Sequence, residues 1–152
     1  MKQKIFLFFL VIFFINNCGY SPLHLNREKL NMEFLIVDYR GDYQINSVIR
    51  SKLSMHKSDK VEDLIKININ TKYEKNDFSK DTSGNIEDYE LIALTEFELD
   101  IKGSPTKISF DEKFIIKNFA DDFEEDSYEK EIKDNFANSI YNKLINHILQ
   151  TL

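Results

Sequence analysis

Three segments of this chain alternate between apolar and polar residues, and each predicts a strand with one buried face. The first covers 64–73 and the second 89–101. The third buries Ile108, Phe110, Phe114 and Ile116, and Glu112 interrupts its apolar face, which suggests a bulge or an exposed rim there. A fourth strand is predicted over 32–39, where a dense apolar run indicates burial.

Turn-forming residues separate the three alternating segments. Residues 76–88 are rich in Asp, Ser, Asn and Gly and predict a long hairpin loop. Gly103, Ser104 and Pro105 predict a tight turn. Strands joined in this way are antiparallel neighbours, whereas the strand at 32–39 joins through a helical crossover.

Two segments repeat apolar residues every three or four positions, as amphipathic helices do. In the first, Asp42 caps the start and the end is expected near Met55 or His56. Its stripe consists of Ile45, Val48, Ile49 and Lys52/Leu53. The second helix follows an acidic run at 121–126, which favours a helix amino terminus. Its stripe consists of Tyr128, Ile132, Phe136, Ile140, Leu144 and Ile148.

The order of elements is therefore β-α-β-β-β-α. It predicts an α+β fold with two helices packed on one face of a four-stranded mixed sheet.

The chain begins with a different pattern. Lys2 and Lys4 precede an unbroken apolar run at 5–15, which is shorter than a membrane-spanning helix and matches the core of a signal peptide. The only cysteine, Cys18, follows three residues later, where a thiol accepts diacylglycerol in bacterial lipoproteins. We therefore expect a signal peptide at 1–17. A plain signal peptide or an uncleaved anchor is the alternative.

The rest of the chain divides into a lipidated tether at 18–31 and one domain at 32–152. One cysteine excludes an intramolecular disulfide framework. The full chain has a net charge of −6, and loss of Lys2 and Lys4 leaves 18 basic against 26 acidic residues, a charge of −8. Such a domain is a poor non-specific binder of nucleic acid, so no nucleic-acid partner is expected.

Catalysis has little support in the sequence. His24, His56 and His147 are far apart, and no nucleophile lies in a recognisable motif. The acidic run lacks the spacing and the glycine of an EF-hand. We expect no catalytic residue, no cofactor and no metal.

The outward face of the predicted sheet mixes charges with an apolar patch. Basic residues on two strands flank an acidic central strand, so cross-strand pairs explain most of the charges. They do not explain Ile92, Leu94 and Ile115. Lys113 and Lys117 lie beside Ile115 and could meet an anionic amphiphile, although scattered exposed apolar residues are an equal alternative.

The segment Cys18-Gly19-Tyr20-Ser21-Pro22-Leu23 resembles the C-G-[FY]-x-P-L start of the LptE family, the lipopolysaccharide-assembly lipoproteins of Gram-negative outer membranes. The order of elements, with Tyr89-Glu90-Leu91 opening the third strand and a long carboxy-terminal helix, is similar as well. The resemblance covers the whole mature chain.

This resemblance implies a plug and assembly partner of an LptD-like β-barrel, anchored by lipid to the periplasmic side of the outer membrane and in contact with lipopolysaccharide. Cys18 is the lipid attachment site by motif. Our candidates for lipopolysaccharide contact are Lys66, Lys72, Lys113, Lys117 and Ile115. Two other functions stay open: a subunit of another envelope-assembly complex, and a periplasmic lipid-binding carrier with an enclosed apolar cavity.

Overall fold

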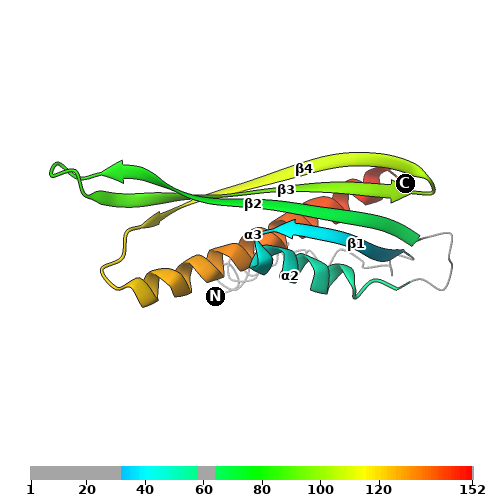
Figure 1. Ribbon diagram of the computed structural model, residues 1–152, viewed down its shortest axis with the longest axis horizontal. Helices are drawn as coiled ribbons and strands as arrows, with labels where there is room; N and C mark the ends of the chain where they lie inside the picture. The colour runs from blue at the N-terminus through cyan, green and yellow to red at the C-terminus, as the bar shows by residue number, and fades with distance from the viewer. Residues whose placement is uncertain (1–31, 58–63, 152) are drawn as a thin grey trace, which may run out of the picture.

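The computed structural model of the protein describes residues 32–57 and 64–151 (Figure 1). The predicted signal peptide at 1–17 and the tether at 18–31, with Cys18, lie outside the described residues.

The described elements follow the expected order. They are β1 (Glu33–Gly41), α2 (Tyr43–Leu53), β2 (Leu64–Lys80), β3 (Ile86–Ile101), β4 (Ser104–Lys117) and α3 (Asp122–Thr151). The strands form one sheet in the order β1-β2-β3-β4, with β1 parallel to β2 and the other pairs antiparallel. Both helices lie on one face of this sheet (Figure 1). The predicted α+β fold, with its mixed sheet and its helices on one side, is confirmed.

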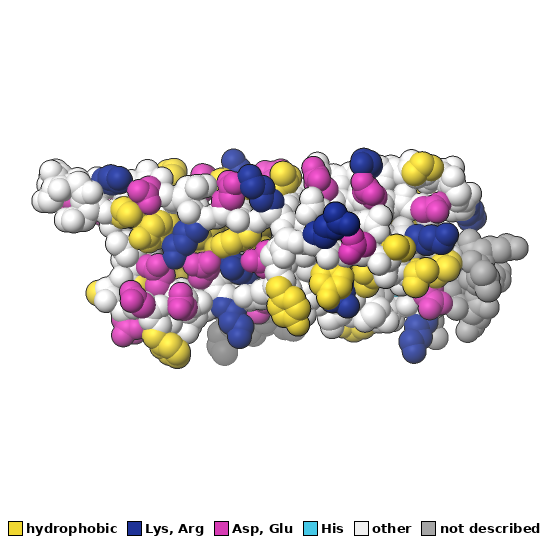
Figure 2. Space-filling view, in the orientation of Figure 1, with side chains coloured by type: hydrophobic (Ala, Val, Ile, Leu, Met, Phe, Trp, Pro, Cys, Tyr) yellow, Lys and Arg dark blue, Asp and Glu magenta, His cyan; other side chains and the backbone are white. Residues whose placement is uncertain are grey.

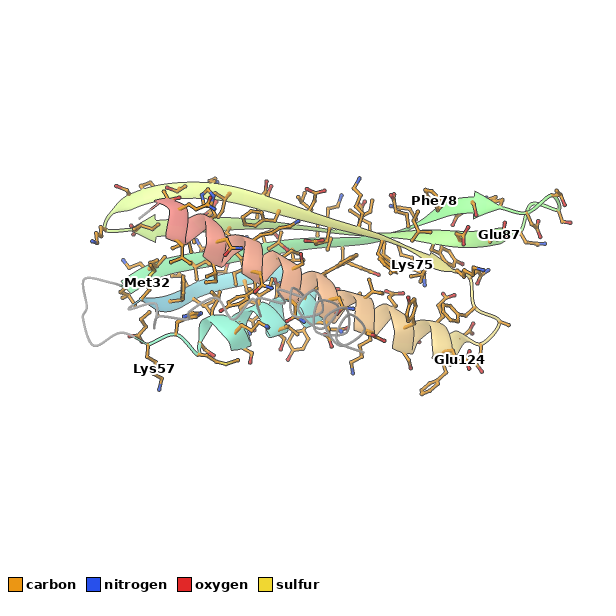
Figure 3. All side chains as sticks on the ribbon, turned by 180° about the vertical axis from the view of Figure 1, so that it is seen from behind. Met32, Lys57, Lys75, Phe78, Glu87 and Glu124 are labelled. Atoms are coloured by element: carbon orange, nitrogen blue, oxygen red, sulfur yellow. The ribbon has the colours of Figure 1, made fainter. Side chains whose placement is uncertain are left out.

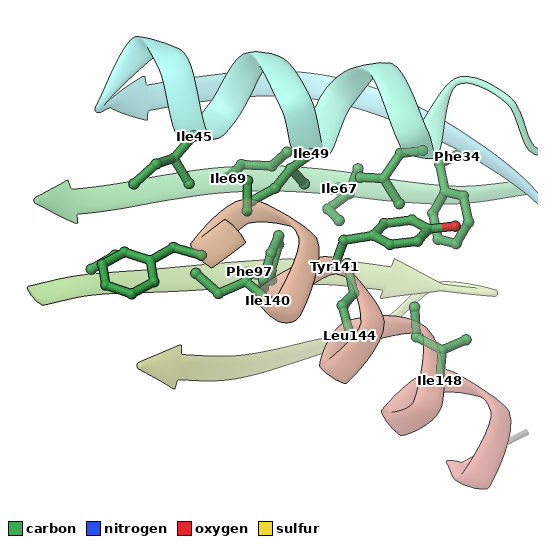
Figure 4. Packing of buried hydrophobic residues seen from close by; sticks show 14 of the residues in the cluster. Phe34, Ile45, Ile49, Ile67, Ile69, Phe97, Ile140, Tyr141, Leu144 and Ile148 are labelled. Carbon is green, nitrogen blue, oxygen red and sulfur yellow. The ribbon is translucent and has the colours of Figure 1, made fainter. Parts of the chain in front are cut away.

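The core fills the space between the sheet and the two helices (Figure 4). Alternate residues of β2 and β3 point into it, because side chains of a strand alternate between the faces of a sheet. The stripes of α2 and α3 meet them from the other side. Its largest fully buried side chains are Phe97, Ile45, Ile49, Leu53, Ile67, Ile69, Leu91, Leu99, Ile116, Ile140, Leu144 and Ile148.

The prediction of a buried first strand was wrong. β1 is an edge strand, and Phe34 is the only buried side chain among its residues. Leu35 and Val37 are exposed because the helices cover one face of the sheet only, and Val37 lies at a shift of register between Ile36 and Asp38. A short apolar run does not tell a strand buried on both faces from an edge strand covered on one.

The long hairpin loop predicted at 76–88 was also wrong. β2 and β3 continue to Lys80 and from Ile86, so the connection is short. This distal part of the hairpin extends past the helices (Figure 1). Its side chains have no core to face, and backbone pairing holds the strands together without an apolar pattern. The Asp81 carboxylate closes the turn by accepting the amide protons of Ser83 and Asn85 at 2.8 and 2.9 Å.

The second hairpin turns earlier than predicted. Lys102 and Gly103 carry the turn with φ of 54° and 83°, a pair of positive values typical of two-residue hairpin loops. Ser104 and Pro105 already belong to β4 and pair with Ile101 and Asp100. Proline is tolerated there because β4 is an edge strand.

Two expectations for β4 fail at its inner face. Neither the bulge nor the exposed rim expected at Glu112 occurs, because Glu112 pairs with Ala93 in unbroken register and its side chain is 19% exposed. Its carboxylate faces α3 instead and accepts hydrogen bonds from Ser139 and Lys143, which explains an acidic residue at an inward position. Phe114, predicted to be buried, is 42% exposed.

The acidic run forms the start of α3. Asp121 precedes the helix, and its carboxylate accepts the amide protons of Phe123 and Glu124 at 2.8 and 3.1 Å. Asp122, Glu124 and Glu125 occupy the first turn, where negative charge is favourable to the helix dipole. The helix therefore begins inside the run rather than after it, and the predicted role of these carboxylates at a helix amino terminus is confirmed.

A buried polar junction fixes α2 against the end of β1. The side chain of Asn46 is fully buried; its amide group donates to the carbonyl of Arg40 at 2.8 Å and accepts from the hydroxyl of Thr71 at 2.8 Å. Thr71 in turn bonds the hydroxyl of Thr95 at 2.9 Å. Gly41 turns the chain here with a φ of +88°, and a Cβ at this position would lie 1.8 Å from the carbonyl oxygen of Thr71.

Gly41→Ala is expected to lower the free energy of unfolding by about 3 kcal/mol or more, because positive φ and a backbone clash act together. Gly84→Ala is the matched control: its φ is +89°, but nothing lies within 4 Å of the added Cβ, so a loss of about 1–2 kcal/mol is expected. Urea unfolding of both variants measures the difference. Equal losses would contradict the close approach of Gly41 to β2.

Candidate functional site

The candidate site is the outer face of the sheet, on the side opposite the helices. The structure places all five candidate contact residues there. Lys66 and Lys72 lie on β2, and Lys113, Ile115 and Lys117 lie on the edge strand β4. All five are exposed. The predicted assignment of these residues to the outward face is therefore confirmed.

The five residues do not form one cluster. In the strand register, Lys66 lies opposite Asp100 near one end of β3, whereas Lys117 lies opposite Asp88 near the other. Twelve residues of strand separate these positions, which is roughly 40 Å. Lys72 lies between the two ends, opposite Leu94. The face thus divides into a proximal part around Lys66 and a distal part on β4.

The distal part is formed by three consecutive outward residues of one strand. Lys113, Ile115 and Lys117 alternate with inward residues, so the two ammonium groups lie on either side of an isoleucine that is 47% exposed. Ile92 pairs with Lys113 and lies diagonal to Ile115 on the same face, and Leu94 follows it, 37% exposed. The apolar patch expected from the sequence is therefore continuous across β3 and β4.

The charges of the face fall into two groups. Lys107 donates to Glu98, and this hydrogen bond lowers the pKa of Glu98 and raises the pKa of Lys107. Lys72 pairs with Glu74 in the same way and lowers its pKa. Lys113 and Lys117, by contrast, form no ion pair with any described residue, so their charges remain available to a ligand.

A polar hollow of about 240 Å³ lies on the proximal part of the outer face. Its charged walls are Asp38 and Arg40 from β1 and Glu96 and Glu98 from β3. Arg40 donates to Asp38 at 2.8 Å, so the one cation of the hollow is already paired. The hollow is therefore acidic in balance, unlike the distal part. Figure 2 shows how closely acidic and basic side chains alternate over the side of the molecule that it displays.

An ion-pair network on the opposite face supports the distal part. Lys75 of β2 donates to Glu125 at 2.6 Å and to Glu129 at 3.0 Å, and both acids belong to α3. The hydroxyl of Tyr73 also donates to Glu129, at 2.9 Å. Figure 3 shows Lys75 between the sheet and the amino-terminal half of α3. Charged groups therefore hold the amino-terminal half of α3 against β2, next to buried core residues such as Leu91, the register partner of Lys75.

Lys133 extends the network to α2. Its ammonium lies 3.2 Å from Asp42, the N-cap of α2, and 3.5 Å from Glu129. It also lies over the ring of Tyr73, 3.9 Å from the centroid. One strand, β2, and the two helices are thus joined, directly or through Tyr73, by one set of half-buried charges.

The pKa values of this network follow from the contacts. Burial alone would lower the pKa of Lys75, but its hydrogen bonds to Glu125 and Glu129 outweigh burial and raise it. Burial, the largest single influence, would raise the pKa of both glutamates. The hydrogen bond from Lys75 and its charge, together with the hydrogen bond from the Phe119 amide to Glu125 and that from Tyr73 to Glu129, outweigh burial and lower both pKa values. Burial and the bond to Glu129 raise the pKa of Tyr73, which keeps its hydroxyl protonated. Sequence reasoning missed this network because its partners are about 50 residues apart.

The two histidines that the structure describes, His56 and His147, pack against aromatic side chains. The ring of His56 approaches the hydroxyl of Tyr141 at 2.6 Å and packs edge-on against Phe34. His147 packs edge-on against Phe110. Within 32–57 and 64–151, no group of three or more His, Cys, Asp or Glu is arranged to hold a metal ion. None of the helices in those two ranges combines the length and the hydropathy needed to cross a membrane.

Comparison with known proteins places the fold among solved lipoprotein structures. No family model and no curated protein matches the chain. The crystal structure of the rare lipoprotein B from Shewanella oneidensis matches with a TM-score of 0.57 at 15% identity, over 77% of this chain and 98% of that one. A minor lipoprotein from Acinetobacter baumannii matches with a TM-score of 0.51 at 10% identity, over 76% and 93%. At such identities the likeness is one of fold.

Lys75→Met is expected to lower the free energy of unfolding at pH 7 by about 1–3 kcal/mol, because it takes from two half-buried carboxylates the ammonium group that they share. Lys80→Met is the control, since Lys80 is 55% exposed and makes one surface pair at 3.4 Å. Its effect should stay within about 0.5 kcal/mol.

The effect of Lys75→Met should depend on pH. The lowered pKa values of Glu125 and Glu129 stabilise the fold above their ordinary value of 4.5, and this contribution is lost as the pH falls below it. The raised pKa of Lys75 stabilises the fold below 10.5 and is lost as the pH rises through the folded value. Denaturant unfolding at pH 3.5 and pH 7 should therefore show a smaller difference at the lower pH. A difference that does not change would contradict the network.

Proposed function

We propose that this protein is a non-catalytic outer-membrane lipoprotein that acts as plug and assembly partner of a lipopolysaccharide-translocating β-barrel. The observation that carries the proposal is the fold shared with the rare lipoprotein B over 98% of that chain, together with an apolar leader that ends at Cys18. The lipid on Cys18 tethers the domain to the periplasmic side of the outer membrane. Two or more acyl chains make such an anchor stable, whereas one is marginal.

The properties of the domain support this role. A rigid α+β body with charges of both signs over its surface suits the wet, polar interior of a large barrel. A periplasmic lipid carrier would instead need an enclosed apolar cavity. The space between sheet and helices, where such a cavity would lie, is filled by core side chains that are 0–7% exposed. A subunit of another envelope-assembly complex stays as the second candidate, since the fold is equally compatible with it.

The distal part of the outer face is the proposed contact for lipopolysaccharide. Lys113 and Lys117 would meet anionic groups of the sugar-phosphate region, and Ile115 would meet an apolar part of the lipid. Glu90 pairs with Ile115 across the sheet and offsets part of the positive charge, so binding through this face should be moderate and sensitive to salt. Lys72 flanks the patch from β2, and Lys66 would make a separate contact at the proximal end.

Replacement of both free lysines, Lys113→Gln with Lys117→Gln, should weaken lipopolysaccharide binding at least threefold and reduce its dependence on salt. Lys107→Gln is the matched control, since Lys107 lies on the same strand and face but is already paired with Glu98. Titration with purified lipopolysaccharide at 50 and 300 mM NaCl measures both effects. Unchanged affinity in the double variant would show that these lysines are not contacts.

Purification of the tagged chain from the envelope of its own cells, in mild detergent, tests the proposal as a whole. A one-to-one complex with a large barrel protein is expected. Recovery with a different envelope assembly would favour the second candidate, and recovery of the chain alone would count against both.

Cys18→Ala separates the anchor from the partner. The mature parent chain is expected to carry fatty acid by mass spectrometry, and the variant to lack it. A parent chain without fatty acid would refute the anchor and leave the partner to be judged by the complex.

A further inference from the structure

A second surface lies away from the outer face, at the start of α3. A hollow of about 360 Å³ opens there between the loop that follows β4 and the first turns of the helix. Three aromatic residues, Phe119, Phe123 and Tyr128, form its apolar walls. Phe123 is 80% exposed, more than any other large hydrophobic residue in the part of the chain that the structure describes. The folded domain therefore leaves an aromatic side chain in water.

The walls of the hollow are held in place by contacts beneath it. The ring of Phe119 packs against that of Tyr128 with centroids 5.5 Å apart, and the amide of Phe119 donates to Glu125 at 3.0 Å. Glu125 is itself bound by Lys75, and Asp121 caps the turn that carries Phe123. A ligand would thus meet a preformed surface, and little conformational entropy would be lost on binding.

The rim of the hollow is acidic. Glu124 and Glu131 line it, and Asp121, Asp122 and Asp126 lie within the same turns of chain. These five carboxylates form no ion pair with any described residue, in contrast to Glu125 and Glu129. Figure 3 shows Glu124 at the free end of α3. The uncompensated negative charge repels phosphate groups and anionic lipid headgroups, and it attracts Lys and Arg side chains.

We propose that this hollow docks a basic segment of a partner polypeptide, with an apolar side chain against Phe119, Phe123 and Tyr128 and flanking Lys or Arg side chains at Glu124 and Glu131. Apolar burial supplies affinity at the centre, and the carboxylates supply specificity and a faster encounter. α3 lies on one face of the sheet (Figure 1), and the alternation along β4 places Lys113 and Lys117 on the other, so the segment and a lipid can be bound together. The site therefore adds a second contact that does not depend on the function proposed above.

Fluorescence anisotropy with a labelled synthetic nonapeptide, Leu-Phe-Leu flanked by three lysines on each side, tests the proposal on the purified full-length chain. Binding at 50 mM NaCl is expected to weaken at least fivefold in Phe123→Ala and to weaken again at 300 mM NaCl. Phe78→Ala is the matched control, because Phe78 is also an exposed phenylalanine, 53% exposed, on the hairpin at the same end of the molecule. It should leave binding unchanged.

Two further peptides and one lipid separate the alternatives. Peptides with three glutamates on each side, or with Gly-Gly-Gly at the centre, should bind at least fivefold more weakly than the basic apolar peptide. Phosphatidylcholine vesicles added to the assay as competitor should not displace the basic peptide from the parent chain, so that the Phe123-dependent signal remains. The proposal is overturned if Phe123→Ala binds as the parent does, if the acidic peptide binds as tightly as the basic one, or if the vesicles abolish the Phe123-dependent signal.

Discussion

The pairing of β2 with β3 is the constraint on which the rest of the structure depends. Its register runs without a shift from Ile65 opposite Ile101 to Asp77 opposite Tyr89. Because side chains alternate along a strand, this register decides which residues join the core and which face outward. A slip of one residue would bury the charges of the outer face and expose Ile67, Ile69 and Phe97. The core and the candidate site are thus two consequences of one pairing.

The inner face changes its chemistry along this pairing. Around Phe97 and Ile67 the sheet and helices meet through fully buried apolar side chains. Further along β2 the inward residues become Tyr73 and Lys75, and the helix opposite them carries Glu125 and Glu129. The stabilisation from half-buried ion pairs depends on pH, whereas that from apolar burial does not. The contact between the distal part of β2 and the start of α3 is therefore the part of the domain whose stability depends on pH.

The sequence predicted the parts of the fold that an apolar period encodes. Alternation over 64–73 and 89–101 placed both central strands and their faces correctly, and it placed Lys113 and Lys117 outward. It failed where structure does not depend on apolar burial. The distal hairpin is polar and is held by backbone pairing, so residues 76–80 read as a loop. The network around Lys75 joins residues about 50 positions apart, a distance over which composition and period carry no information.

The sheet has two edge strands, β1 and β4, and each carries features that disfavour pairing with another chain. On β4, Pro105 removes one backbone donor, and the ammonium of Lys143 occupies the carbonyl of Asp111 at 3.0 Å. On β1, the irregularity at Val37 interrupts a flat row of donors and acceptors. Copies of this protein crowded together are thereby discouraged from adding strand to strand into aggregates. Resistance to aggregation at high protein concentration therefore comes from the edge strands as well as from the surface charge.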